Sequence, residues 1–117
     1  MNLLIGYDKC TTCKKAKAWL EENGISYESR PIKEQNPTKD ELMQWWQSSG
    51  LPRQKFVNTS GQLYRQMNLK DKLPTLSDEE FFELLSTDGM LVKRPLLIAE
   101  NGIAVGFKEE QWKQIFA

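Results

Sequence analysis

Cys10 and Cys13 are the residues of this chain whose type and spacing are best suited to chemistry. They are the only cysteines among 117 residues, and two threonines separate them. An apolar run over residues 3–7 precedes the pair, and a helical pattern follows it directly. A Cys-x-x-Cys motif that a strand delivers to the start of a helix is typical of thiol–disulfide exchange. We therefore predict a redox-active pair.

The expected helix gives the two thiols different roles. Residues three apart lie on one helix face, with Cβ atoms about 5–6 Å apart, so a disulfide between them needs only modest adjustment. Cys10 is expected at the helix N-terminus, where free N–H groups, the helix dipole and nearby lysines favour a thiolate. Cys13 lies on the stripe that should face the core. We predict that Cys10 is the nucleophile and that Cys13 resolves the mixed disulfide into a Cys10–Cys13 disulfide.

The pair also has two plainer interpretations. Half of a zinc site is disfavoured, because such a site needs four ligands and the sequence has no histidine and no third cysteine. We expect no metal. Inert hydrophobic packing suits Cys13 but not Cys10, which has charged and polar neighbours. The lack of histidine also excludes Cys–His and Ser–His nucleophile mechanisms.

Composition narrows the class of protein. The sixteen basic and sixteen acidic residues give zero net charge, which argues against direct nucleic-acid binding through bulk charge. The length predicts one domain over residues 1–117. The sequence shows no signal peptide and no long apolar run, so we expect a cytoplasmic protein without a membrane partner. In a reducing cytosol a close cysteine pair is more often catalytic or sensing than structural.

The first third of the chain predicts a strand–helix–strand unit. Its expected strands cover residues 3–7 and 25–32, and its helix covers residues 11–23 and ends at Gly24. Such a unit implies a right-handed crossover and parallel pairing of the two strands.

Helices are expected in the middle of the chain. Thr38 with Glu41 and Ser77 with Glu80 form capping-box patterns. Gly50 should end the first of these helices and the second should end near Gly89, while a short helix between them would be capped by Thr59 or Ser60.

The end of the chain returns to β-structure. Residues 96–98 and 103–107 read as a hairpin with a turn at Asn101-Gly102, and residues 108–116 as a last helix. The predicted fold is α/β, a thioredoxin-like layout with a four-stranded mixed sheet and a helical subdomain inserted over about 36–90.

These features resemble the arsenate reductase and Spx family of thioredoxin-like proteins, and the likeness spans essentially the whole chain. The matching segments are Cys10-Thr11-Thr12-Cys13-Lys14-Lys15-Ala16, Asn36-Pro37, Asp88-Gly89-Met90-Leu91 and Lys93-Arg94-Pro95-Leu96. A Cys-x-x-Cys motif followed about eighty residues later by Arg-Pro before a strand is a specific combination.

The resemblance implies roles for residues far from the motif. Pro95 is expected to be cis and to face the active cysteine, and Arg94 to lie near Cys10, where it would stabilise a thiolate or bind an oxyanion. Without the family pattern, Lys93 and Arg94 would fit a solvated loop equally well. The residues expected to contact an anion or substrate are Thr11, Thr12, Asn58, Arg94 and Pro95.

Arsenate is disfavoured as the substrate. Relatives that reduce arsenate hold it with three arginines, of which only Arg94 is matched; the other two positions carry Asn58 and Phe107. A phosphatase-like arsenate reductase is excluded, because the residue six places after either cysteine is Ala16 or Trp19 rather than arginine.

Three functions are therefore expected, in order of preference. The first is a thiol–disulfide oxidoreductase that acts on a small thiol or protein disulfide. Such an enzyme would need no bound cofactor, and an external thiol (glutathione, glutaredoxin or thioredoxin) would reduce its Cys10–Cys13 disulfide again. The second is an Spx-like redox-sensing regulator that contacts RNA polymerase, although the sequence has no basic tail and residues 50–53 are only loosely similar. The third is a glutathione- or thioredoxin-coupled arsenate reductase.

Overall fold

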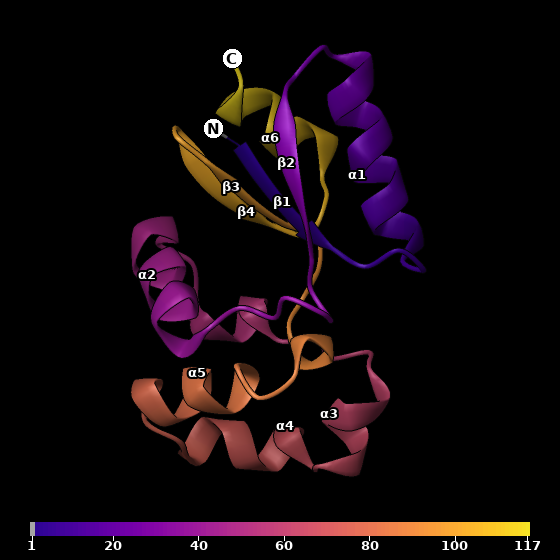
Figure 1. Ribbon diagram of the computed structural model, residues 1–117. Helices are drawn as coiled ribbons and strands as arrows, with labels where there is room; N and C mark the ends of the chain where they lie inside the picture. The colour runs from indigo at the N-terminus through magenta and orange to yellow at the C-terminus, as the bar shows by residue number, and fades with distance from the viewer. Residues whose placement is uncertain (1) are drawn as a thin grey trace.

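The computed structural model describes residues 2–117, and a four-stranded sheet forms its upper part (Figure 1). The strands are β1 (Asn2–Gly6), β2 (Tyr27–Pro31), β3 (Leu96–Ala99) and β4 (Gly102–Val105), in the order β2-β1-β3-β4. β1 is parallel to β2 and antiparallel to β3, and β3 is antiparallel to β4. This is the mixed α/β sheet of a thioredoxin-like fold, as the sequence predicted.

Helices α1 (Thr11–Glu22) and α6 (Glu109–Ile115) cover one face of the sheet. Successive strand residues point to opposite faces, so Leu4 packs beneath these helices while Ile5 packs on the other side. Buried Trp112 is the largest side chain between the sheet and α6. The cysteine-bearing helix is thus fixed by a core of its own.

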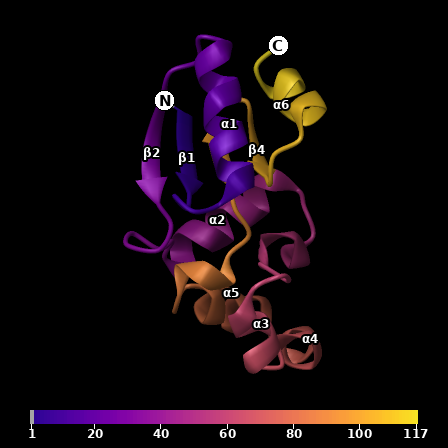
Figure 2. The same cartoon turned by 90° about the vertical axis from the view of Figure 1, so that its right-hand side faces the viewer.

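The segment between β2 and β3 is helical and lies beyond the other face of the sheet. It comprises α2 (Lys39–Ser49), η1 (Arg53–Phe56), α3 (Gln62–Gln66), α4 (Leu69–Lys72), η2 (Leu73–Thr75), α5 (Asp78–Leu85) and η3 (Gly89–Leu91). The described chain is elongated, 41 × 28 × 23 Å, with α3 and α4 at the far end from the sheet (Figure 2). Within residues 2–117, no helix is both long enough and apolar enough to cross a membrane.

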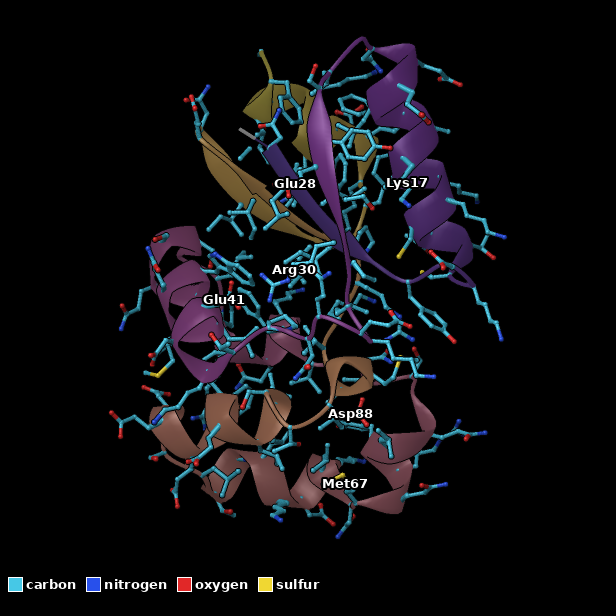
Figure 3. The ribbon with its side chains drawn as sticks, viewed as in Figure 1. Lys17, Glu28, Arg30, Glu41, Met67 and Asp88 are labelled. Carbon is cyan, nitrogen blue, oxygen red and sulfur yellow. The ribbon has the colours of Figure 1, made fainter. Side chains whose placement is uncertain are left out.

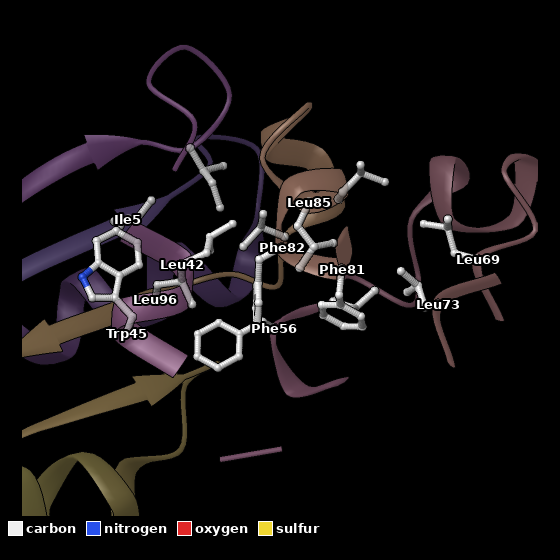
Figure 4. Close-up of a cluster of buried hydrophobic side chains, with 14 residues drawn as sticks. Ile5, Leu42, Trp45, Phe56, Leu69, Leu73, Phe81, Phe82, Leu85 and Leu96 are labelled. Atoms are coloured by element: carbon white, nitrogen blue, oxygen red, sulfur yellow. The ribbon is translucent and has the colours of Figure 1, made fainter. Parts of the chain in front are cut away.

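One apolar cluster joins this helical segment to the sheet. Ile5 and Leu96 of the sheet meet Leu42 and Trp45 of α2, and Phe56 and Phe82 continue the cluster toward Leu69 (Figure 4). Phe56 and Phe82 pack edge to face, with ring centroids 6.0 Å apart. The cluster therefore fixes η1, one wall of the site described below.

Local signals in the sequence located most element ends. Both capping boxes are present, and Gly24 and Gly50 adopt positive φ angles of 66° and 70° where their helices end. The predicted end of α5 near Gly89 was wrong, because the helix stops at Leu85 and Gly89 begins η3.

Two other predicted boundaries were also wrong. Neither Thr59 nor Ser60 caps α3: the cap is Gly61, and the Ser60 hydroxyl donates instead to Asn58 Oδ1 at 3.2 Å. The hairpin turn is at residues 100–101, since Gly102 pairs with Ala99 inside the ladder. In both cases another local interaction, a loop hydrogen bond or the last pair of the hairpin, moved the boundary by a residue or two.

A very close backbone approach joins the end of β2 to η3. A Cβ atom on Gly89 would lie 1.9 Å from the carbonyl oxygen of Ile32. The Ile32 N–H donates to the Gly6 carbonyl oxygen at 2.8 Å. Only a residue without a side chain fits at position 89, so glycine is required there for space.

Arg30 clamps the connection from β2 to α2. Its guanidinium donates to both carboxylate oxygens of Glu41, at 2.7 and 2.8 Å, and to the carbonyl oxygens of Gln35 and Asn36 (Figure 3). The hydrogen bonds that Glu41 accepts from Arg30, together with the bonds from Thr38 and the charge of Arg30, lower the pKa of Glu41 to about 2. The clamp ties the sheet to the first helix of the inserted segment.

Substitution of Gly89 tests the close approach. We expect Gly89→Ala to lower the free energy of unfolding by about 3 kcal/mol, because the added methyl overlaps backbone that cannot move independently. Gly102→Ala is the control, since its Cβ would first meet the side chain of Ile115, at 3.2 Å. Urea unfolding followed by circular dichroism measures both. Equal losses in the two variants would contradict the proposed constraint.

The Arg30–Glu41 pair predicts a pH dependence of stability. Because the Glu41 pKa is depressed on folding, its stabilisation is complete above the ordinary value of 4.5 and is lost as pH falls toward 2. We expect Glu41→Gln to cost on the order of 1 kcal/mol at about pH 7, because the Glu41 side chain is 34% exposed and solvent screens the pair, and less at about pH 3.

Glu80→Gln is the matched control for this prediction. Glu80 occupies the same capping-box position in α5 and makes no ion pair among the described residues. Urea midpoints at both pH values compare the two variants. If Glu80→Gln destabilised the protein as much as Glu41→Gln at neutral pH, the clamp would carry no stability of its own.

Candidate functional site

Cys10 caps the N-terminus of α1. Its backbone is extended, with φ −90° and ψ 117°, and its Sγ accepts a hydrogen bond from the Cys13 N–H at 3.3 Å. Its own N–H donates to the carbonyl oxygen of Tyr7 at 3.0 Å, which closes the turn from β1 into the helix. The thiol is half-buried and so remains open to a substrate. A sulfur in this position receives both a hydrogen bond and the favourable end of the helix dipole.

Cys13 lies behind Cys10 and is only 2% exposed. A Cβ atom on Gly6 would lie 3.2 Å from its Sγ, so the glycine lets the thiol pack directly on β1. Burial, together with the hydrogen bond and the charge of Cys10, raises the pKa of Cys13 from its ordinary value of 9.0 to about 12. The backbone of Tyr7 and the charge of Arg94 act in the opposite direction. Both cysteines are free thiols in the structure.

Arg94 and Pro95 are brought to the same end of the sheet as the cysteines. The Arg94–Pro95 peptide bond is cis, as the resemblance implied. The Arg94 guanidinium lies 5.3 Å from the centroid of the Tyr7 ring and donates to the Val92 carbonyl oxygen at 3.4 Å. Its positive charge lowers the pKa of Cys13, so the guanidinium lies within electrostatic reach of the pair.

Tyr7 is a site residue that the sequence analysis missed. It acts on each part of the site: its carbonyl oxygen accepts from the Cys10 N–H, its backbone lowers the pKa of Cys13, and its ring lies under Arg94. The only sequence signal for Tyr7 is an aromatic residue between the strand and the motif. An aromatic residue in that position is equally typical of core packing.

The other predicted anion contacts divide into two groups. Thr11 and Thr12 are exposed in the first turn of α1. Asn58 is buried, and its amide nitrogen donates to the Met90 carbonyl oxygen at 3.1 Å. Thr11 and Thr12 are therefore accessible within the motif itself, while the Asn58 carboxamide holds its own loop to η3.

Phe107, at the other position where arsenate-reducing relatives carry arginine, belongs to an aromatic cluster. Its ring meets Trp112 edge-on at 4.8 Å and Trp19 at 6.3 Å. This position contributes to packing between the sheet and α6. Neither Asn58 nor Phe107 supplies a cation.

A groove of about 570 Å³ opens beside the motif. Its walls come from the start of α1, the segment 52–59, and the chain on either side of β3 and β4. Its cations are Lys55, Lys93, Arg94 and Lys108, and no Asp or Glu lines it. The sequence analysis assigned no site role to the three lysines, because they lie on segments far apart in the chain.

The described residues contain no cluster of three or more His, Cys, Asp or Glu side chains that could hold a metal ion. The groups that the fold gathers at the motif are a capped thiol, a buried second thiol and a nearby guanidinium. Together they can carry out nucleophilic attack by sulfur and internal closure of a disulfide.

Removal of Cys10 tests the coupling between the thiols. In Cys10→Ser we expect the pKa of Cys13 to fall below 12, because the charge of Cys10 is gone, yet to stay above the ordinary value of 9.0, because burial remains. Thiolate absorbance against pH measures it. Adding Arg94→Ala to that variant should raise the pKa again. A Cys13 pKa still at about 12 in Cys10→Ser would contradict the coupling.

The chain is similar to known proteins over nearly its whole length. It matches the ArsC family over residues 5–115. The YusI protein of Bacillus subtilis, itself uncharacterised, is 50% identical over 111 residues, 95% of this chain and 94% of that one. The global transcriptional regulator Spx 2 of Bacillus anthracis is 30% identical over 102 residues, 87% of this chain and 76% of that one.

A solved structure shows the same likeness in three dimensions. The crystal structure of an ArsC-family-related protein from Bacteroides fragilis has a TM-score of 0.94 and 50% identity, and covers 97% of this chain and 96% of that one. Sequence and structure agree from β1 to α6, and the chain belongs to the ArsC family.

Proposed function

We propose that the protein is a thiol–disulfide oxidoreductase that uses Cys10 and Cys13 as its redox pair. The observation that carries the proposal is the position of Cys10 Sγ, which caps α1 at 3.3 Å from the Cys13 N–H with the Cys13 thiol buried behind it. The half-buried sulfur is the one that an incoming disulfide meets first. Membership of a family with a thioredoxin-like fold supports this assignment.

The first step is attack of the Cys10 thiolate on one sulfur of a substrate disulfide. A bond forms between Cys10 Sγ and that sulfur, and the other substrate sulfur leaves as a thiolate that takes up a proton from solvent. The N–H groups of α1 stabilise the attacking sulfur while it is charged.

The second step is attack of Cys13 on the Cys10 sulfur. Its thiol loses a proton to solvent, forms the Cys10–Cys13 disulfide and releases the bound half of the substrate as a thiolate. Two of the causes that raise the Cys13 pKa come from Cys10, and they end once Cys10 is bonded to substrate. The charge of Arg94 and the backbone of Tyr7 remain to stabilise the Cys13 thiolate.

The cycle closes when an external thiol returns two electrons to the Cys10–Cys13 disulfide. Glutathione, glutaredoxin and thioredoxin are the candidate reductants. The substrate disulfide is then reduced by two electrons per cycle, and the protein ends as the dithiol in which it began.

A second candidate function is that of an Spx-like regulator, favoured by the 30% identity to the Spx 2 regulator. In that case the Cys10–Cys13 pair would sense oxidation, and RNA polymerase would be the partner. Retention of RNA polymerase on the immobilised protein, lost or gained on oxidation, would favour this function over turnover of a disulfide.

Arsenate reduction is the third candidate. Of the three cation positions, only Arg94 is filled, since Asn58 and Phe107 have structural contacts. Consumption of thiol that depends on added arsenate would favour it.

Two serine variants test the proposed mechanism. Cys10→Ser should lose at least about a hundredfold in disulfide reduction, because the capping nucleophile is absent. Cys13→Ser should still react once and then remain as a mixed disulfide, which intact-protein mass spectrometry detects. Wild-type protein treated identically should show an internal disulfide instead. Full turnover by Cys13→Ser when no thiol is added to the assay would show that Cys13 does not resolve the intermediate.

A further inference from the structure

We propose that the groove beside Cys10 binds an extended anionic disulfide, a small compound that carries at least two separated negative charges. The inference rests on the proposed function and names the class of substrate for the same site. Its basis is the set of cations that the fold gathers there: Lys55 from η1, Lys93 and Arg94 before β3, and Lys108 at the start of α6.

These cations have no carboxylate partners. Within residues 2–117 the three lysine side chains form no hydrogen bond or ion pair, and Arg94 donates only to a backbone carbonyl. The chain as a whole is neutral, so the positive potential in the groove is local rather than a reflection of net charge. An anion that enters would be attracted without first displacing a competing Asp or Glu.

The groove is built before any ligand arrives. An isolated antiparallel bridge pairs Val57 with Val92, and its two backbone bonds run from the Asn58 N–H to the Leu91 carbonyl oxygen and from the Lys93 N–H to the Phe56 carbonyl oxygen. These bonds fix the wall that carries Lys55 against the one that carries Lys93. A rigid wall loses little conformational freedom on binding, which increases affinity for a matching ligand.

The opposite wall is held in a similar way. The Gly106 N–H donates to the Pro95 carbonyl oxygen at 2.8 Å, and the Trp112 indole donates to the Gly106 carbonyl oxygen at 3.2 Å. A Cβ atom on Gly106 would lie 3.8 Å from Lys93 Cε, so that lysine stem lies across the turn. Lys108 follows two residues later.

Size and charge type indicate an extended ligand. A volume of about 570 Å³ matches a small organic molecule and exceeds the space that one tetrahedral oxyanion fills. Lysines are flexible point charges, which suit anionic groups that are spread along a ligand, whereas clustered arginines suit one oxyanion. Thr12, which lies between the two cysteines in the sequence, lines the groove, and the proposal places the sulfur–sulfur bond of the ligand at that end.

A charge series of disulfides of similar length tests the inference. The compounds are 3,3′-dithiodipropionate with two negative charges, neutral bis(2-hydroxyethyl) disulfide, and cystamine with two positive charges. Stopped flow gives the rate constant for attack by Cys10, divided by the rate constant of free 2-mercaptoethanol for the same compound. We expect the normalised rate for the dianion to exceed that for the dication about tenfold at about 20 mM salt and much less at about 200 mM.

Charge-removing variants locate the effect. Lys55→Gln, Lys93→Gln and Lys108→Gln combined should lower the ratio of the dianion rate to the neutral rate about tenfold. The combination of Lys33→Gln, Lys72→Gln and Lys113→Gln removes the same charge outside the groove and should leave that ratio within about twofold. Equal effects of the two combinations would overturn the inference.

Failure of this inference can be told from failure of the proposed function. Equal normalised rates for all three disulfides would overturn the charge selectivity and leave the redox pair standing. If none of the three reacted, the redox function would fail, and calorimetric titration of Cys10→Ser with 3,3′-dithiodipropionate would decide the groove. Millimolar binding that the groove lysine substitutions abolish would support the site, and no binding would overturn it.

Discussion

The geometry of the site depends on the close approach of Gly89 to the Ile32 carbonyl. The Ile32 N–H is bonded to Gly6, and Gly6 is the residue against which Cys13 packs. Gly89 begins the turn that leads to Arg94. Together with the pairing of β1 and β3, this backbone contact sets the position of the thiols relative to Arg94, although the two lie about eighty residues apart in the chain. Neither Gly6 nor Gly89 can gain a side chain without moving one part of the site against the other.

How much the sequence predicts follows from how local each signal is. The capping boxes at Thr38 and Ser77 and the motif at Cys10 are decided within four residues, and all three helices begin where expected. The cap of α3 and the hairpin turn were misplaced because ladder and loop bonds outweighed local preference. The lysines of the groove could not be grouped, since the pairing of residue 57 with residue 92 is not visible in spacing.

The order of the two proposed chemical steps follows from burial. A buried thiol beside another thiol has a raised pKa, so Cys13 stays protonated while Cys10 is free. Once Cys10 is bonded to substrate, its charge no longer opposes ionisation of Cys13, and Arg94 still favours it. The substrate thus activates the thiol that releases it. The same sequence of events would serve a sensor as well as an enzyme, so the thiols alone do not separate the two functions.

The groove separates them better, because a sensor of oxidation has no need to recognise the rest of its oxidant. The resemblance implied an arginine at position 107 for an arsenate site, but this chain has Phe107 there, and its ring packs on Trp19 and Trp112. The neighbouring Lys108 faces the groove together with Lys55. Clustered arginines form one strong anion site, whereas separated lysines form several weaker ones. Separated lysines suit a ligand that is longer than an oxyanion and that stays bound during thiol–disulfide exchange. This arrangement favours turnover of an anionic disulfide.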